Sequence, residues 1–327
     1  MKTDINSIYP KVLFESRKPL PNLVLNLNRK KKDGLLQMDR RFFLPLATSG
    51  ELLSVRQVIL TGEDPLSHDF LREAVEIFSD RFERVSLWLR PGQLRNVDKD
   101  IFRRLNDLIC LMGPFHEEDE ARDSIESLKK ETVVLRESDK NLDLRAVLYL
   151  SRATINSLPK FVAMIENSGF QKLDFFPPNL FLPEAEKRIE EPLNPSLLPY
   201  KKDLLTEEER LWDLLEEPEL QTPLFDLNIT RRQLLRVYTW YRAALGEGGF
   251  APPYCRAPRL SFYIEPEGLV RCCPWQPVLG NLREESILKI AGKNHTRYFR
   301  ADINLAKNRF CPACPGDYPH FLMRIRS

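Results

Sequence analysis

Six short apolar runs recur along the first 176 residues of the chain, each bounded by polar or turn-forming residues. Runs of this length, rich in Val, Ile and Leu, are typical of strands that are buried on both faces of a parallel sheet. The predicted strands cover residues 23–28, 56–60, 84–89, 108–112, 144–150 and 172–176.

Segments with helical spacing of apolar residues lie between these runs, over 69–82, 123–131 and 158–169. In the first of them, Phe70, Ala74, Ile77 and Phe78 fall on one helical face. Strands that alternate with helices predict a parallel sheet made of βα units, which puts the chain in the α/β class. Periodicity alone leaves two architectures open, an open sheet and an incomplete barrel.

The alternation stops after residue 176. Residues 177–205 carry six prolines and predict an irregular connector, followed by one helix that begins near Thr206 and another that runs from about Thr230 to Gly246. The apolar face of the second helix is predicted at Leu234, Leu235, Tyr238 and Tyr241, with Trp240 to one side.

The pattern changes again near residue 250. Residues 259–264 and 269–271 predict a hairpin in which Gly268 supplies the turn, and a short helix is expected over 284–293. We therefore expect four segments: an N-terminal extension over 1–20, a βα domain over 21–176, a connector with two helices over 177–249, and a small α+β domain over 250–327.

Composition and charge narrow the class of protein. The chain is 43% hydrophobic and 29% charged with a formal net charge of +2, so no overall field attracts nucleic acid. No apolar run approaches the roughly 18 residues of a spanning helix, and the first residues lack the apolar core of a signal peptide. We expect a cytoplasmic protein with no membrane span and no nucleic-acid partner.

Five of the six cysteines lie between residues 255 and 314. Cys311 and Cys314 form a C-x2-C pair, which directs two thiolates at one point, and Cys255 with Cys273 could complete a set of four soft ligands. Cys272 is the alternative to its neighbour Cys273. In a reducing compartment such a set favours an iron–sulfur cluster, and zinc is the alternative.

The sequence of this region resembles the auxiliary-cluster domain of radical SAM enzymes, called SPASM in its full form and twitch in its shortened form. The similarity is carried by YIEPEGLVRCCPW at 263–275, LGNLREESILKI at 279–290 and the C-x2-C pair, and it extends upstream to VILTGEDPLSHDFLREAVEIF at 58–78. The resemblance implies a partial (β/α)6 TIM-like barrel followed by a small SPASM/twitch-like domain. It also implies one 4Fe-4S cluster, held by Cys255, Cys273, Cys311 and Cys314.

Two parts of the radical SAM pattern are altered or missing. The motif that ends the second strand survives only in degraded form, and by the resemblance Gly62 and Glu63 would be its S-adenosylmethionine-binding remnant. The loop that should carry C-x3-C-x2-C reads NRKKKDG over 28–34 and has no cysteine. Because three thiolates must hold the cluster that binds S-adenosylmethionine, we expect no reductive cleavage of that cofactor. The basic run from Arg29 to Lys32 is either an anion or partner site, or a solvated loop.

These features predict a pseudoenzyme of the radical SAM superfamily that keeps its auxiliary cluster. It would act as an accessory, binding or electron-transfer protein, with an active radical SAM enzyme or a peptide or protein substrate as partner. Two alternatives remain open. One is an enzyme of a different mechanism that uses the barrel mouth and keeps a structural cluster, and the other is a zinc-stabilised scaffold. The four histidines show no spacing typical of a catalytic triad or metal site.

Overall fold

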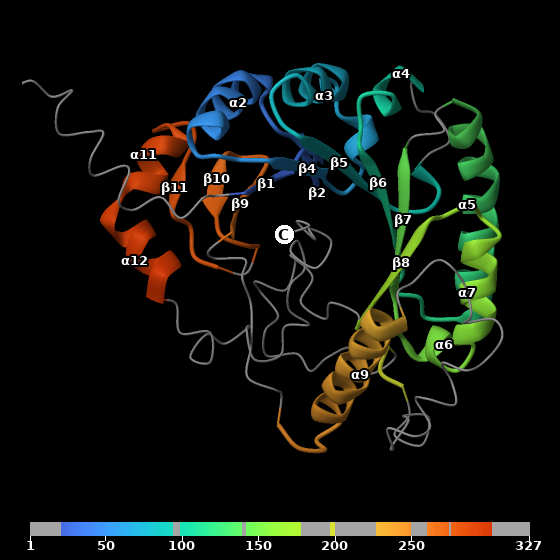
Figure 1. The fold of residues 1–327 in the computed structure, drawn as a ribbon. Coiled ribbons are helices and arrows are strands. Elements are labelled where there is room, and N and C mark those ends of the chain that lie inside the picture. The colour runs from blue at the N-terminus through green and yellow to red at the C-terminus, as the bar shows by residue number, and fades with distance from the viewer. Residues whose placement is uncertain are drawn as a thin grey trace, which may run out of the picture. The chain divides into compact units, whose positions relative to one another are not determined.

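The computed structural model describes residues 21–93, 99–138, 142–177, 197–199, 227–249, 260–274 and 276–302. The chain divides into two compact units. Unit 1 joins Met1–Val85 to Cys255–Asn304 and Asp317–Ser327, and unit 2 comprises Ser86–Tyr254 and Leu305–Gly316. Each unit is built on its own run of strands, shown in Figure 1.

Strand β1 lies between β9 and β4 in the sheet of unit 1, where the strand order is β11-β10-β9-β1-β4. Its two neighbours are parallel to it and come from opposite ends of the chain, with Val24 beside both Ile59 of β4 and Tyr263 of β9. Strand β10 pairs in antiparallel fashion with both β9 and β11. The bounds are β1 Asn22–Asn26, β4 Gln57–Thr61, β9 Ser261–Ile264, β10 Leu269–Arg271 and β11 Gly280–Asn281.

Helix α2 packs closely against one face of this sheet. A Cβ atom on its Gly50 would lie 2.6 Å from the Phe82 ring and 3.6 Å from Leu23, so a larger residue would need the ring to move. Leu23 and Leu25 are fully buried on that face. The helices of unit 1 are η2 Arg40–Phe42, α2 Phe43–Leu52, η3 Pro65–Ser67, α3 Leu71–Ser79, α11 Ile287–Gly292 and α12 Asn294–Asp302.

Unit 2 holds a parallel sheet in the order β5-β6-β7-β8. Helices α5 and α7 lie side by side along it, as Figure 1 shows. Helix α9 packs against β8, and its Tyr241 hydroxyl donates a hydrogen bond to the Leu150 carbonyl. The elements are β5 Arg84–Leu89, which starts at the end of unit 1, α4 Lys99–Phe102, β6 Asp107–Met112, α5 Glu118–Ser138, β7 Asp143–Tyr149, α6 Arg152–Ile155, α7 Leu158–Glu166, β8 Lys172–Phe176 and α9 Leu227–Ala244.

All six strands predicted from the apolar runs are confirmed. The helical faces were predicted less well: Leu235 and Phe70 are 43% and 37% exposed, whereas Trp240 is buried. The pattern gave no prediction for α2, whose sequence contains Pro45 and Gly50. The helix expected near residue 206 and the C-x2-C pair at Cys311 and Cys314 lie outside the described residues.

Candidate functional site

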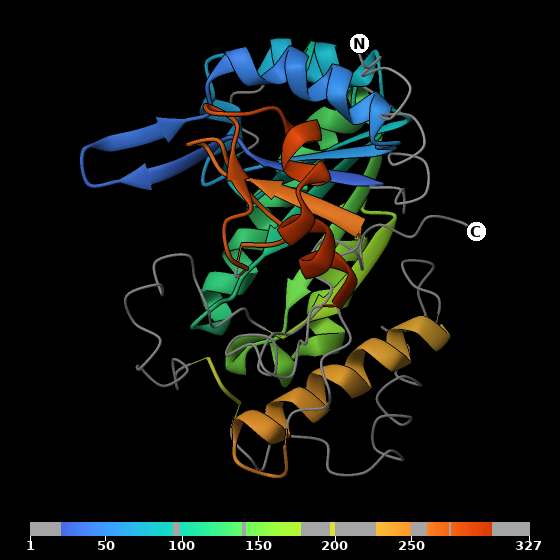
Figure 2. The ribbon, with the colours of Figure 1, turned by 90° about the vertical axis from the view of Figure 1, so that its left-hand side faces the viewer.

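The segment that follows β1, expected as a loop over 28–34, forms a β-hairpin. Strand β2 (Asn28–Lys31) pairs in antiparallel fashion with β3 (Gly34–Gln37), and Gly34 has a φ of 127° at the turn. Figure 2 shows this hairpin extending away from the sheet of unit 1. The chain therefore pairs with itself at the place where the radical SAM pattern would have a cluster-binding loop.

Asn28 at the base of the hairpin holds the loop that contains Gly62 and Glu63. Its main-chain carbonyl accepts a hydrogen bond from the Glu63 amide at 3.0 Å, and its side-chain Oδ1 accepts one from the Asp64 amide at 3.0 Å. Its Nδ2 donates to the Asp64 carbonyl and, at 3.3 Å, to Ser67 Oγ. Asn28 is fully buried, so these bonds replace water on the main chain of the 63–64 segment.

The space beside Gly62 is also filled by Asn28. A Cβ atom on Gly62 would lie 2.5 Å from Asn28 Oδ1 and 3.0 Å from its carbonyl oxygen. Glu63 is exposed. The two residues predicted as an S-adenosylmethionine-binding remnant therefore face their own chain and the solvent.

The basic run of the hairpin is partly neutralised by the turn between β9 and β10. Arg29 pairs with Glu267 and lies 3.9 Å from Glu265, and Lys31 Nζ is 3.3 Å from Glu267. Partial burial raises the pKa of Glu267, but its backbone hydrogen bond and the Arg29 and Lys31 cations together hold that pKa below its usual value. Half of the predicted anion or partner site is thus engaged within unit 1.

The adjacent cysteines follow β10 and lie in different environments. The turn before β10 is made by Gly268, with a φ of 88°, as the sequence predicted. Cys272 is fully buried, while Cys273 is partly exposed and its carbonyl accepts a hydrogen bond from the Gln276 amide at 3.1 Å. Burial lowers the pKa of Arg300, and the nearby Cys272 thiol acts in the opposite direction.

The other three predicted ligands, Cys255, Cys311 and Cys314, lie outside the described residues, so the ligand set stays a prediction. Within the part of the chain that the structure describes, no three Cys, His, Asp or Glu side chains are grouped as a metal site. Cys110 is fully buried in β6, and burial raises the pKa of its thiol far above the usual range. That thiol is poorly suited to metal binding or nucleophilic chemistry.

Polar side chains line the face of the unit 1 sheet that is turned away from Leu23 and α2. Asn22 and Asn26 of β1 lie on this face with the apolar Val24, paired with Ile59, between them. Polar residues recur at the paired positions of the neighbouring strands, because in-register residues of parallel strands point to the same face. Asn26 Nδ2 donates to the Tyr263 hydroxyl at 2.8 Å, while its buried Oδ1 has no partner among the described residues. The members of this polar face are Asn22, Asn26, Gln57, Thr61, Ser261 and Tyr263.

The polar face was missed at the sequence level, although the alternation of asparagine in NLVLNLN over 22–28 carries the signal. The prediction of one apolar run over 23–28 holds for the face that includes Leu23, Leu25 and Leu27. A strand with one apolar and one amide-rich face is suited to a sheet that meets helices on one side and polar groups on the other.

Residues 255–315 match the SPASM family, described as an iron-sulfur cluster-binding domain. This confirms the assignment of the C-terminal region. The order of β9, the Gly268 turn, β10, Gly280–Asn281 and α11 is the order that the resemblance predicted. No curated protein sequence matches the chain. No described helix has the length and apolar character needed to cross a bilayer.

Solved structures share the fold along most of the chain. Streptococcus suis SuiB bound to S-adenosylmethionine is 12% identical with a TM-score of 0.56, over 95% of this chain and 75% of that chain. SuiB bound to its precursor peptide SuiA is 11% identical with a TM-score of 0.57, over 96% and 76%. Native anSMEcpe with bound AdoMet and Cp18Cys peptide is 15% identical with a TM-score of 0.55, over 91% and 88%. At such identities the likeness shows the fold, and it confirms the predicted α/β barrel-type architecture with a SPASM region at the C-terminus.

Proposed function

From a radical SAM-type fold that ends in a SPASM iron-sulfur region, we propose a pseudoenzyme that binds an auxiliary cluster but does not cleave S-adenosylmethionine. The observation that carries this proposal is the hairpin at Asn28. In it, the segment where three cluster ligands would be needed holds no cysteine and instead fixes the neighbouring loop.

The proposed ligands of a single 4Fe-4S cluster are Cys255, Cys273, Cys311 and Cys314. Four thiolates are the donor set that such clusters use, and the C-x2-C pair supplies two of them from one turn. Cys273 is favoured over Cys272 because it is partly exposed beyond the end of β10, whereas Cys272 is enclosed in the core of unit 1. When bound, a cluster of this kind supplies a one-electron redox centre.

The residues near Gly62 do not fit S-adenosylmethionine. The amide groups of Glu63 and Asp64 already donate to Asn28, so they are not available to a ligand. The space that a ligand atom would need beside Gly62 is taken by Asn28 Oδ1. We therefore derive no reaction step through this cofactor.

The proposed role is that of an accessory or binding component in a reducing, cytoplasmic setting. The polar face of unit 1, where Asn26 Oδ1 has no partner among the described residues and Asn26 Nδ2 donates to the Tyr263 hydroxyl, offers hydrogen-bonding groups that suit a polar ligand such as a peptide backbone. Neighbouring structures were solved with peptides bound, which supports a peptide, or the enzyme that modifies it, as the partner.

The test is anaerobic purification followed by iron and sulfide analysis, EPR, and an assay for 5′-deoxyadenosine after reduction with dithionite and addition of S-adenosylmethionine. We expect about four irons and four sulfides per chain, as one cluster of this type contains, and no 5′-deoxyadenosine. One zinc per chain without sulfide would favour the zinc-stabilised scaffold over the iron–sulfur protein. Formation of 5′-deoxyadenosine would refute the loss of activity.

A further inference from the structure

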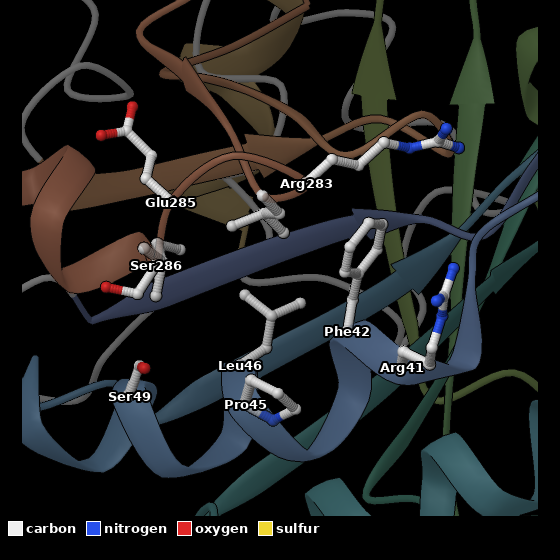
Figure 3. A pocket seen from close by; sticks show the side chains of 10 residues that line it. Arg41, Phe42, Pro45, Leu46, Ser49, Arg283, Glu285 and Ser286 are labelled. Carbon is white, nitrogen blue, oxygen red and sulfur yellow. The ribbon is translucent and has the colours of Figure 1, made fainter.

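A cavity of about 390 Å³ lies within unit 1, between helix α2 and the segment that leads into α11. Its volume is in the range of sites that bind small ligands or single side chains with their flanking groups. Figure 3 shows the side chains that line it. They are Arg41, Phe42, Pro45, Leu46, Ser49, Leu282, Arg283, Glu285, Ser286 and Ile287.

The middle of the cavity is apolar and held in place by packing. Leu46 and Ile287 are buried on opposite walls. The Phe42 ring lies against Gly268, where an added Cβ atom would be 3.0 Å from two ring carbons. Because these groups belong to a helix and to segments packed against it, the apolar part exists before any ligand enters.

One end of the cavity has an excess of positive charge. The Arg41 and Arg283 side chains extend toward this end (Figure 3). Asp39 accepts hydrogen bonds from the Arg41 amide at 2.9 Å and from Arg41 Nε at 2.9–3.0 Å. Chiefly the bond from Arg41, with Arg283 as a weaker contributor, lowers the pKa of the Asp39 carboxyl to about 2. Asp39 therefore neutralises Arg41, whereas Arg283 forms no ion pair with any residue in the described part of the chain, which leaves an excess positive charge at this end.

The other end carries no such excess. Glu285 lies opposite the arginines (Figure 3) and is neutralised by Lys293, with Lys289 Nζ at 4.0 Å. Ser49 and Ser286 provide hydroxyl groups near the Glu285 end (Figure 3), where the Ser286 oxygen also accepts a hydrogen bond from the Lys289 amide at 3.3 Å. The cavity thus combines an apolar slot, hydrogen-bonding groups and a net cation at one end.

We propose that this cavity binds an extended segment of a partner protein in which a large apolar side chain precedes a glutamate or aspartate. The apolar side chain enters between Leu46 and Ile287, and the carboxylate lies against Arg283 and Arg41. The serine hydroxyls suit the amide groups of a peptide better than an all-hydrocarbon chain. Cys273, the one predicted cluster ligand within the described part of the chain, does not line the cavity. The proposed binding uses none of the ligands, so it is independent of the proposed function.

The test measures fluorescence anisotropy of labelled peptides Ser-Gly-X-Glu-Gly-Ser, with X as Leu, Phe or Trp, added to the full-length protein as purified with its metal. Matched peptides carry Gln in place of Glu, or Ser in place of X. We expect saturable binding that weakens about 1.5- to fivefold with the Gln peptide, the range of a largely exposed charge pair. It should weaken more strongly with the Ser peptide, because the apolar contact is lost.

Arg283→Glu should weaken peptide binding at least as much as the change of Glu to Gln in the peptide does. The affinity of Arg283→Gln should lie between those of the wild type and Arg283→Glu. Arg297→Glu is the control, because it makes the same charge change on an exposed arginine of α12 outside the cavity. Circular dichroism melting checks that each variant is folded. Equal weakening by the Arg283 and Arg297 variants, or no saturable binding of any peptide with X and Glu, overturns the proposal. Peptide binding at this cavity does not depend on the iron content of the protein. A failure of the peptide proposal can therefore be told apart from a failure of the cluster assignment.

Discussion

Replacing Asn28 by alanine should destabilise unit 1, because this side chain replaces water on a buried turn. Its amide makes one hydrogen bond to the Asp64 N–H at 3.0 Å, one to the Asp64 carbonyl and a longer one to Ser67 Oγ at 3.3 Å. Two good bonds are worth about 1 kcal/mol each, and a donor left buried without a partner adds about 1–3 kcal/mol. The expected loss is roughly 3–5 kcal/mol in the free energy of unfolding.

The assay is thermal unfolding followed by circular dichroism at a fixed protein concentration. For a folding unit of this size, each kcal/mol of lost stability lowers the melting temperature by about 2–4 °C, so the melting temperature should fall by several degrees or more. Asn156→Ala is the control, since that asparagine is exposed and should change stability by less than about 0.5 kcal/mol. A loss for Asn28→Ala no larger than that of the control would refute the reasoning.

A double-mutant cycle tests the second claim, that Asn28 fills the space beside Gly62. In the wild type, Gly62→Ala places a methyl group 2.5 Å from Asn28 Oδ1, whereas Asn28→Ala removes that atom and leaves main-chain contacts of 3.0 and 3.1 Å. Gly62→Ala should therefore cost less in the Asn28→Ala background, with a coupling of about 1 kcal/mol or more. Additive effects would mean that the two residues do not compete for one space.

Two further predictions concern the SPASM region. Cys273→Ser should abolish retention of the iron–sulfur cluster, measured as iron and sulfide per chain, whereas Cys272→Ser should keep most of the iron; equal losses would mean that the ligand is wrongly assigned. Gly268→Ala should lower the free energy of unfolding more than Gly246→Ala does. Both glycines have a positive φ, 88° and 82°, which costs alanine about 1–2 kcal/mol. Only an alanine at position 268 would also press against the Phe42 ring. Urea unfolding measures the difference, and equal destabilisation by the two alanines would show that the Phe42 contact costs nothing.

The sequence was informative where one physical requirement acts over a continuous stretch. Strands of a parallel sheet must be apolar because helices cover them, and the runs at 84–89 and 172–176 match β5 and β8 at both ends. The Gly268 turn was predictable because a positive φ strongly favours glycine. Helical faces were harder: Leu235 and Trp240 lie on different faces of α9, and only packing within unit 2 decides which face is buried.

The sequence by itself determined which thiolate ligands are present and where, because residue types are fixed in the chain. It places five cysteines between residues 255 and 314 and none in the segment 28–34 that directly follows the first strand. Only the tertiary structure decided what that first loop became. Nothing in NRKKKDG alternates between apolar and polar residues, and the hairpin there is held by contacts with residues distant in sequence, such as that of Arg29 with Glu267, 238 positions away. The tertiary structure also decided that β9 joins β1, and that Cys272 is enclosed while Cys273 is not. Such outcomes depend on which segments meet in space, and a local pattern of residues does not carry that information.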